Sequence, residues 1–187
     1  EHRRLLESRA AQRLTGWRYL RTTLEARVWR SAERDAIRRF GRVIVCREDD
    51  RRYLGADNVA VVANGVAVPQ VDFTPGLPGR MLFVGLMNFL ANDDAMRHFV
   101  SQVMPRIRRR VPEASLDIVG AGVSDELREL SAREPVRILG FVEDLAACYA
   151  DAAISVVPLR VASGTTIKIL ESLARRDALA APLCQAL

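Results

Sequence analysis

The second half of the chain alternates between short apolar runs and segments with the spacing of amphipathic helices. In chain order, the expected strands are 81–84, 115–119, 136–139 and 154–157, and the expected helices are 92–110, 124–133, 143–150 and 165–174. Nearly continuous apolar strands that alternate with helices are typical of a parallel sheet with helices on both faces. The pattern therefore predicts an α/β fold whose ligands bind beyond the carboxyl ends of the strands.

Residues 1–40 are dense in Arg, Leu and Ala, and their apolar residues recur at roughly helical intervals. This spacing predicts one long basic helix, or two helices that break near Gly16. We expect its Trp and Leu stripe to pack inside the protein and its basic face to be solvated. A helix of this kind also suits peripheral contact with an anionic membrane surface. Two β-branched runs, 42–46 and 59–63, predict short buried strands.

A stretch rich in Pro and Gly separates these two parts of the chain. Asn64 and Gly65 form a turn dipeptide, and the segment that follows reads as a linker. We therefore expect a first domain at 1–66, a linker at 67–79 and a second domain at 80–187.

Composition narrows the class of protein. The 187 residues are 49% hydrophobic and 27% charged, with no apolar run of about 18 residues and no apolar signal segment at the start, so we expect a cytoplasmic protein. The three cysteines and two histidines are isolated in the sequence. They suggest no disulfide framework, no metal site and no catalytic triad.

Two further classes of ligand are disfavoured. The net charge of +5 suits an anionic partner, but aromatic residues are only 6% of the chain and no nucleic-acid reader motif is present, so we expect no nucleic-acid binding. Gly120-Ala-Gly122 follows a predicted strand, yet Asp125 stands where the dinucleotide fingerprint has its third glycine. The partial match disfavours a nicotinamide or flavin enzyme.

The segment 152–174 joins a predicted strand, a polar turn and a helix. Ser163, Gly164, Thr165 and Thr166 can cap this helix, whose amino end attracts anions. Lys168 and Glu171 lie about one helical turn apart and can face the same crevice. The spacing fits a phosphate or nucleotide site and equally a solvated ion pair.

Glycines follow three other predicted strands at the same edge of the sheet. They are Gly85, Gly120 with Gly122, and Gly140. Glycine lets the backbone approach a ligand closely, although it also serves ordinary strand-to-helix turns.

Several separate segments resemble one known family in their order and spacing. They are Val59–Val66 with Phe73, Phe83–Gly85 with Asn92, Asp94 and Ala95, Pro105 with Arg109 and Pro112, Leu116–Gly120, Val136–Val142 with Asp144, and Ile154–Leu159. Over about residues 40–187 the chain is similar to the retaining nucleotide-sugar glycosyltransferases of the GT-B fold, of the family 4 or group 1 kind. The resemblance implies a Rossmann-like donor domain, preceded by a remnant of the acceptor-side domain.

The resemblance also implies positions for the nucleotide-sugar donor. Glu171 falls on the second glutamate of the Glu-x7-Glu signature, which holds the ribose hydroxyls, and Lys168 would neutralise the leaving diphosphate. The loop that begins at Phe141 would receive the base. The complete set of expected donor-binding residues is Gly85, Gly120, Phe141, Ser163, Gly164, Thr165, Thr166, Lys168 and Glu171.

The implied activity is transfer of a sugar, with retention, from a nucleotide-diphosphate sugar to a glycan or lipid-linked acceptor in polysaccharide biosynthesis. No metal or cofactor is expected, and the site of action would be the cytoplasm, at the inner face of the membrane if the basic helix binds there. Ser163 replaces the first signature glutamate, and the sequence covers only part of the family's length, so catalytic residues are expected mainly outside it. The alternative is a catalytically inactive nucleotide-binding or remnant domain.

Overall fold

The computed structural model describes residues 16–68, 75–160, 167–175 and 178–180. Contacts divide the chain into two compact units, and the division falls between Gly65 and Val66. The first unit contains the residues up to Gly65, and the second contains the strands and helices that follow. Each unit is described by itself.

The first unit contains helix α2 (Trp17–Arg39), strand β1 (Val43–Val45), helix α3 (Glu48–Leu54) and strand β2 (Val59–Val61). Both predicted strands are present, and they pair in parallel. The expectation that they are buried is wrong except at Val59, since Ile44 and Val61 are exposed. Helix α3 was not predicted. It has no buried residue, and its sequence carries no apolar stripe that would predict a helix. Its ends are instead marked by three acidic residues in the first turn and by Gly55, which has a left-handed conformation after the last turn.

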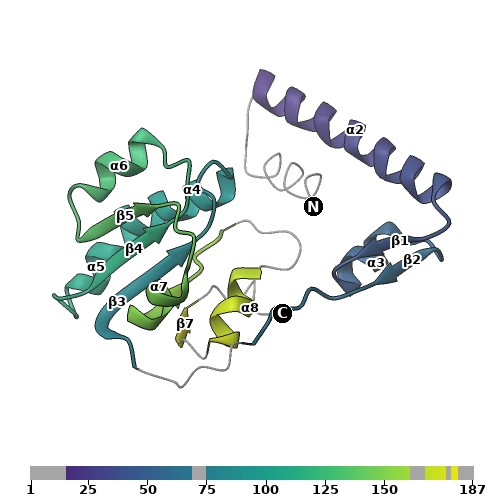
Figure 1. Ribbon diagram of the computed structural model, residues 1–187. Coiled ribbons are helices and arrows are strands. Elements are labelled where there is room, and N and C mark those ends of the chain that lie inside the picture. Colours follow the sequence, from purple (N-terminus) through teal and green to yellow (C-terminus); the bar gives the residue numbers. More distant parts are fainter. Residues whose placement is uncertain (1–15, 69–74, 161–166, 176–177, 181–187) are drawn as a thin grey trace. The chain divides into compact units, whose positions relative to one another are not determined.

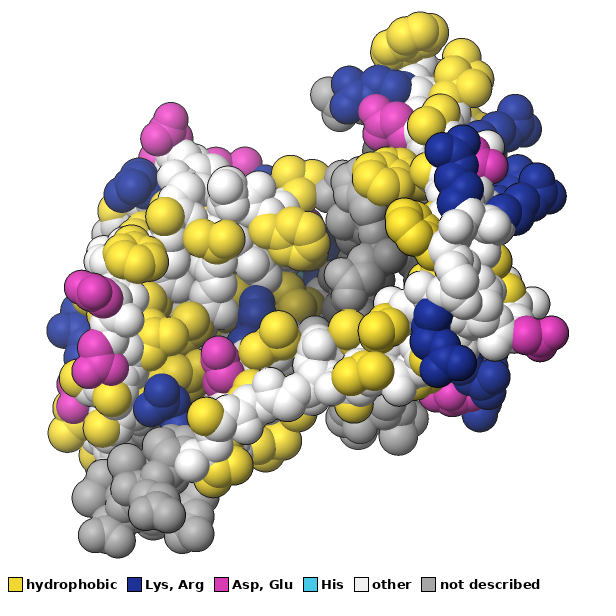
Figure 2. All heavy atoms as spheres, turned by 45° about the vertical axis from the view of Figure 1, so that its right-hand side comes forward, with side chains coloured by type: hydrophobic (Ala, Val, Ile, Leu, Met, Phe, Trp, Pro, Cys, Tyr) yellow, Lys and Arg dark blue, Asp and Glu magenta, His cyan; other side chains and the backbone are white. Residues whose placement is uncertain are grey.

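Helix α2 is present as predicted, but the expected packing of its apolar stripe is wrong for the described residues. Trp17 is 74% exposed and Val28 is 68% exposed, and Leu20, Leu24 and Trp29 are also exposed. Figure 2 shows hydrophobic and basic side chains next to each other on this helix, at the upper right. Periodicity identifies an apolar face of a helix, but it does not say what covers that face.

The second unit is a five-stranded parallel sheet with the strand order β5-β4-β3-β6-β7 (Figure 1). The strands are β3 (Leu77–Val84), β4 (Ser115–Val119), β5 (Val136–Gly140), β6 (Ala152–Val156) and β7 (Ala178–Ala180). The helices are α4 (Leu90–His98), the π-helix η1 (Phe99–Val103), α5 (Met104–Arg108), α6 (Asp125–Ser131), α7 (Ala146–Asp151) and α8 (Ile167–Ala174). This arrangement confirms the predicted α/β fold.

Apolar side chains fill the space on both faces of the sheet because neighbouring residues of a strand point to opposite sides. Phe83, Leu116 and Ile118 pack with residues of α4, η1, α5 and α6 on one face. Leu82 packs with Tyr149 of α7 on the other face. Leu82 and Phe83 are at most 1% exposed, so β3 is the central strand of the core.

Some element boundaries differ from the prediction. Strand β3 begins at Leu77 rather than at 81, within the segment expected as a linker. Pro78 and Gly79 read as strand breakers in a sequence, yet here they lie at the start of the strand, where its register with β6 shifts. The helix predicted at 92–110 is interrupted by the five π-helical residues of η1.

The strand order reverses at one place, and in sheets of this kind the reversal point is where a ligand crevice forms. From β3 the chain proceeds through β4 to β5 on one side, and β6 and β7 then lie on the other side of β3. The order therefore reverses between β3 and β6, and ligands of such sheets bind beyond the carboxyl ends of the strands at this point. These ends are Val84 and Val156.

Candidate functional site

A row of glycine backbones forms the carboxyl edge of the sheet. The N–H of Gly85 donates to the carbonyl of Val119 at 2.9 Å, and the N–H of Gly120 donates to the carbonyl of Gly140 at 2.7 Å. Gly120 has a φ of +144°, and a Cβ atom there would lie 1.9 Å from the Gly85 carbonyl oxygen. Gly120 is thus required for the close approach of two strand ends, whatever its relation to a ligand.

Two side chains occupy the space above Gly85. A Cβ atom on Gly85 would lie 2.9 Å from Nδ2 of Asn92 and 3.0 Å from Nζ of Lys168. Asn92 belongs to the first turn of α4 and Lys168 to the first turn of α8, so helices that follow the two strands of the crevice meet here. The structure therefore brings together Lys168 and Gly85, two of the residues expected at the donor site.

The ammonium group of Lys168 is held from two sides. Its Nζ donates to Oδ1 of Asn92 at 2.8 Å and lies 4.6 Å from the centroid of the Phe83 ring. Nδ2 of Asn92 donates in turn to the Leu86 carbonyl at 2.7 Å. The hydrogen bond from Lys168 thus goes to an amide and not to the Glu171 carboxylate, which disfavours the solvated ion pair that the spacing alone allowed.

Burial changes the acidity of this lysine. Desolvation lowers the pKa of Lys168 from 10.5 to about 8, and the charge of Glu171 partly offsets this effect. At neutral pH the side chain is still mainly a cation, held in a partly dehydrated site by a neutral amide. Such a cation has its charge available for an anionic ligand. Lys168 is also the single lysine among the 28 Lys and Arg residues of the chain.

The other predicted site residues differ in their location and exposure. Glu171 is half-buried on α8, one turn after Lys168. Phe141 follows β5 directly and is 77% exposed, at the same edge of the sheet. Ser163, Gly164, Thr165 and Thr166 lie outside the described residues.

Asn92 was not among the predicted site residues. It is 6% exposed and both ends of its amide are hydrogen-bonded. The signal in the sequence is a polar residue in the first turn of a helix after a strand of the crevice. That signal does not distinguish a site residue from an ordinary helix-start residue.

Further ion pairs fix helix α4 beside the crevice. Asp93 accepts a hydrogen bond from Oγ of Ser124 at 2.6 Å and pairs with Arg97. Asp94 makes a two-point pair with Arg160, which follows β6, at 2.6 and 3.1 Å. The neighbours of Asn92 in the sequence are therefore engaged away from Lys168.

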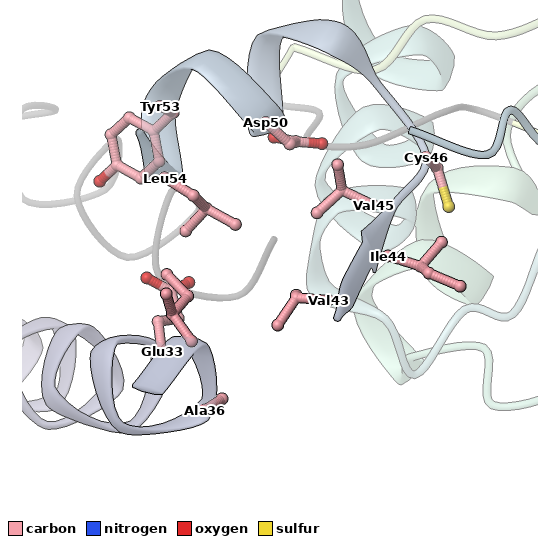
Figure 3. Close-up of a pocket in the computed structure, with 10 residues that line it drawn as sticks. Glu33, Ala36, Val43, Ile44, Val45, Cys46, Asp50, Tyr53 and Leu54 are labelled. Atoms are coloured by element: carbon pink, nitrogen blue, oxygen red, sulfur yellow. The ribbon is translucent and has the colours of Figure 1, made fainter. Parts of the chain in front are cut away.

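A separate cavity of about 270 Å³ lies in the first unit, between α2, β1 and α3 (Figure 3). Its lining is mainly apolar and includes Val43, Val45 and Leu54. Its charged lining residues are the acidic Glu33 and Asp50. The described residues that line this cavity include no Lys or Arg side chain that could contact a phosphate, so the crevice with Lys168 is the stronger candidate for an anionic ligand.

The fold and this site define a parallel α/β domain with a cationic crevice at its topological switch point. The sequence matches the family described as "Glycosyl transferases group 1" over residues 78–180. This match covers more than half of the chain, and the protein belongs to this family of glycosyltransferases.

Comparison with solved structures agrees on the fold. S. aureus TarM, solved as a mutant in complex with Fondaparinux, alpha-GlcNAc-glycerol and UDP, is 15% identical with a TM-score of 0.68, over 78% of this chain and 30% of TarM. Anabaena HepE, solved with UDP and glucose, is 14% identical with a TM-score of 0.65, over 81% of this chain and 47% of HepE. The chain thus spans less than half the length of these proteins. Comparison with curated proteins gives no significant match.

Proposed function

We propose that the second unit binds the nucleotide-diphosphate part of a nucleotide-sugar donor. The observation that carries this proposal is the Lys168 ammonium group, which stands above Gly85 at the reversal point between β3 and β6. A compact cation in a partly dehydrated crevice is suited to a diphosphate. TarM and HepE, which share the fold, were solved with UDP, and this supports the proposal.

In this proposal the chain is the donor-binding part of a retaining glycosyltransferase of the family 4 kind. When the bond between the sugar and the β-phosphate breaks, negative charge grows on the diphosphate, and Lys168 stabilises that charge. Glu171 accepts hydrogen bonds from the ribose hydroxyls, because a carboxylate can receive two donors from a vicinal diol. The glycan or lipid-linked acceptor binds mainly through a part of the enzyme outside this sequence.

One observation favours a second candidate, a nucleotide-binding domain without catalytic activity. Ser163 stands in the place of the first signature glutamate, which removes a carboxylate from the side of the sugar. Such a domain would keep Lys168 and Glu171 and bind the nucleotide, but it would not support transfer in the complete protein.

Calorimetry with UDP, GDP and ADP tests the binding site. We expect one of these nucleotides to bind, and Lys168→Met to weaken its binding at least tenfold, about 1.4 kcal/mol. Arg106→Met is a matched control, because it removes a positive charge from an exposed position on α5. Equal affinities of the wild type and Lys168→Met would contradict the proposed role. Transfer measured in the complete enzyme then separates the active from the inactive candidate.

The place of action is also a proposal. We propose that the protein acts in the cytoplasm, in polysaccharide biosynthesis, and that α2 makes peripheral contact with anionic lipid through its exposed apolar and Arg side chains. Among the described residues, no helix is long and apolar enough to cross a membrane. Co-sedimentation with phosphatidylglycerol vesicles at low salt tests the contact; protein that stays in the supernatant would exclude it.

A further inference from the structure

The orientation of the Asn92 amide is fixed by its two partners. The Leu86 carbonyl can only accept a hydrogen bond, and the Lys168 ammonium can only donate one. With Nδ2 at 2.7 Å from Leu86 O and Oδ1 at 2.8 Å from Lys168 Nζ, both partners are satisfied. The flipped amide would place donor against donor and acceptor against acceptor, so a single orientation is compatible with this site.

Asparagine is suited to this position in a way that similar side chains are not. Aspartate would neutralise the ammonium charge and could not donate to the Leu86 carbonyl. Leucine has a similar volume but could neither accept from Lys168 nor donate to Leu86. Asparagine holds the ammonium group in place and leaves its charge uncancelled, which is what a site for an anion requires.

We propose that Asn92 is a positioning residue of the donor site, which fixes the Lys168 ammonium group above Gly85 through the Leu86 carbonyl. This inference rests on the proposed function, in which Lys168 contacts the diphosphate. Asn92 itself acts through Lys168, because its amide is already satisfied on both sides by groups of the protein.

Within the described parts of the chain, few groups face Lys168, and their charges can be named one by one. On its own helix, Glu171 is the charged group that acts on its pKa. On α4, Asp93 pairs with Ser124 and Arg97, and Asp94 pairs with Arg160. From β3 the Phe83 ring contacts the ammonium group. A new carboxylate at position 92 would therefore become its nearest opposite charge.

The titration of the lysine side chain tests the positioning role without any nucleotide. Because Lys168 is the single lysine of the chain, a protein labelled with ¹³C at the lysine ε-carbon gives one lysine signal to follow by NMR against pH. We expect Asn92→Asp to raise the midpoint of the Lys168 titration by about one pH unit or more, because a nearby carboxylate favours the charged lysine. We expect Asn92→Leu to lower this midpoint, because the ammonium group loses its hydrogen-bond acceptor. Unchanged midpoints in both variants would overturn the inference.

A matched control separates the effect of direct contact with Lys168 from the effect of an added negative charge nearby. Asn88 lies in the turn just before α4 and is exposed, so Asn88→Asp introduces the same charge without the hydrogen bond to Lys168. We expect its midpoint to stay close to that of the wild type. A shift as large as that of Asn92→Asp would show that position 92 has no special contact and would overturn the inference.

Nucleotide binding links the positioning role to the proposed function. We expect Asn92→Asp and Asn92→Leu to weaken binding of UDP and of pyrophosphate about tenfold, and Asn88→Asp to weaken it much less. If the wild type binds neither UDP, GDP, ADP nor pyrophosphate, the proposed function fails, and the titration still decides whether Asn92 positions Lys168. If the wild type binds and both Asn92 variants bind equally well, the inference is overturned.

Discussion

At the scale of single residues, the chain uses arginine almost everywhere and lysine once. The lysine is half-buried, and its ammonium group lies against an amide and an aromatic ring. A guanidinium group is planar, larger and always charged, whereas an ammonium group is compact and titrates when buried. The choice of lysine at this position therefore fits a requirement of the crevice rather than a general need for positive charge.

Glu171 can be tested separately from Lys168 by comparing two ligands. We predict that Glu171→Gln weakens UDP binding about tenfold, because the amide loses charge-assisted hydrogen bonds to the ribose. Pyrophosphate has no ribose, so its affinity should change little or improve when the carboxylate is removed. Calorimetry with both ligands measures the ratio. Equal losses for UDP and pyrophosphate would mean that Glu171 does not contact the ribose.

Gly120 gives a prediction about stability. Gly120→Ala would place a Cβ atom 1.9 Å from the Gly85 carbonyl oxygen, at a φ of +144°. We expect a loss of about 2 kcal/mol or more in the free energy of unfolding, since both the clash and the backbone conformation are unfavourable. Gly140→Ala is the control: its φ is +71° but nothing lies within 4 Å, so the loss should be about 1 kcal/mol. Urea unfolding of both variants checks the difference; equal losses would contradict it.

At the scale of elements, the sequence predicted those parts of the fold that carry their own periodic signal. Strand β4 has the predicted bounds because Leu116, Ile118 and Val119 are apolar and buried. Helix α3 was missed because five of its seven residues are charged and none of the seven is buried. The meeting of Lys168 with Asn92 could not be predicted, because it joins two helices that are 76 residues apart in the sequence.

Strand β4 also contains a buried charge whose removal should be costly. Asp117 is 5% exposed and accepts hydrogen bonds from Arg80 of β3 and from Arg137 of β5, at distances of 2.7–2.9 Å. We predict that Asp117→Ala lowers the free energy of unfolding by about 3 kcal/mol, because it leaves the partly buried Arg80 without this partner. Arg137→Ala should cost about 1 kcal/mol, since that side chain is 55% exposed. Urea unfolding measures both, and a larger loss for Arg137→Ala would contradict the argument.

At the scale of the whole molecule, the binding role proposed for Lys168 comes with a cost for folding. Lys168 has a pKa of about 8 in the folded protein, below its ordinary value of 10.5. Below pH 8 the lysine is charged in both states, so the folded state bears the full cost of burying the charge. Between pH 8 and 10.5 the folded state releases the proton while the unfolded state retains it, so stability rises with pH over this range.

The stability of Lys168→Met should therefore exceed that of the wild type at pH 7 and approach it at high pH. A shift of this size corresponds to about 3 kcal/mol, and loss of the hydrogen bond to Asn92 reduces the gain to about 2 kcal/mol. Urea unfolding at pH 7 and at pH 10.5 measures this gap, the difference in the free energy of unfolding between Lys168→Met and the wild type. Arg106→Met is the control for net charge. A gap that does not shrink as the pH rises would show that the buried charge is not its cause. If the gap shrinks and Lys168→Met also loses UDP binding, the two results together mean that Lys168 lowers the stability of the fold and is needed for binding the nucleotide.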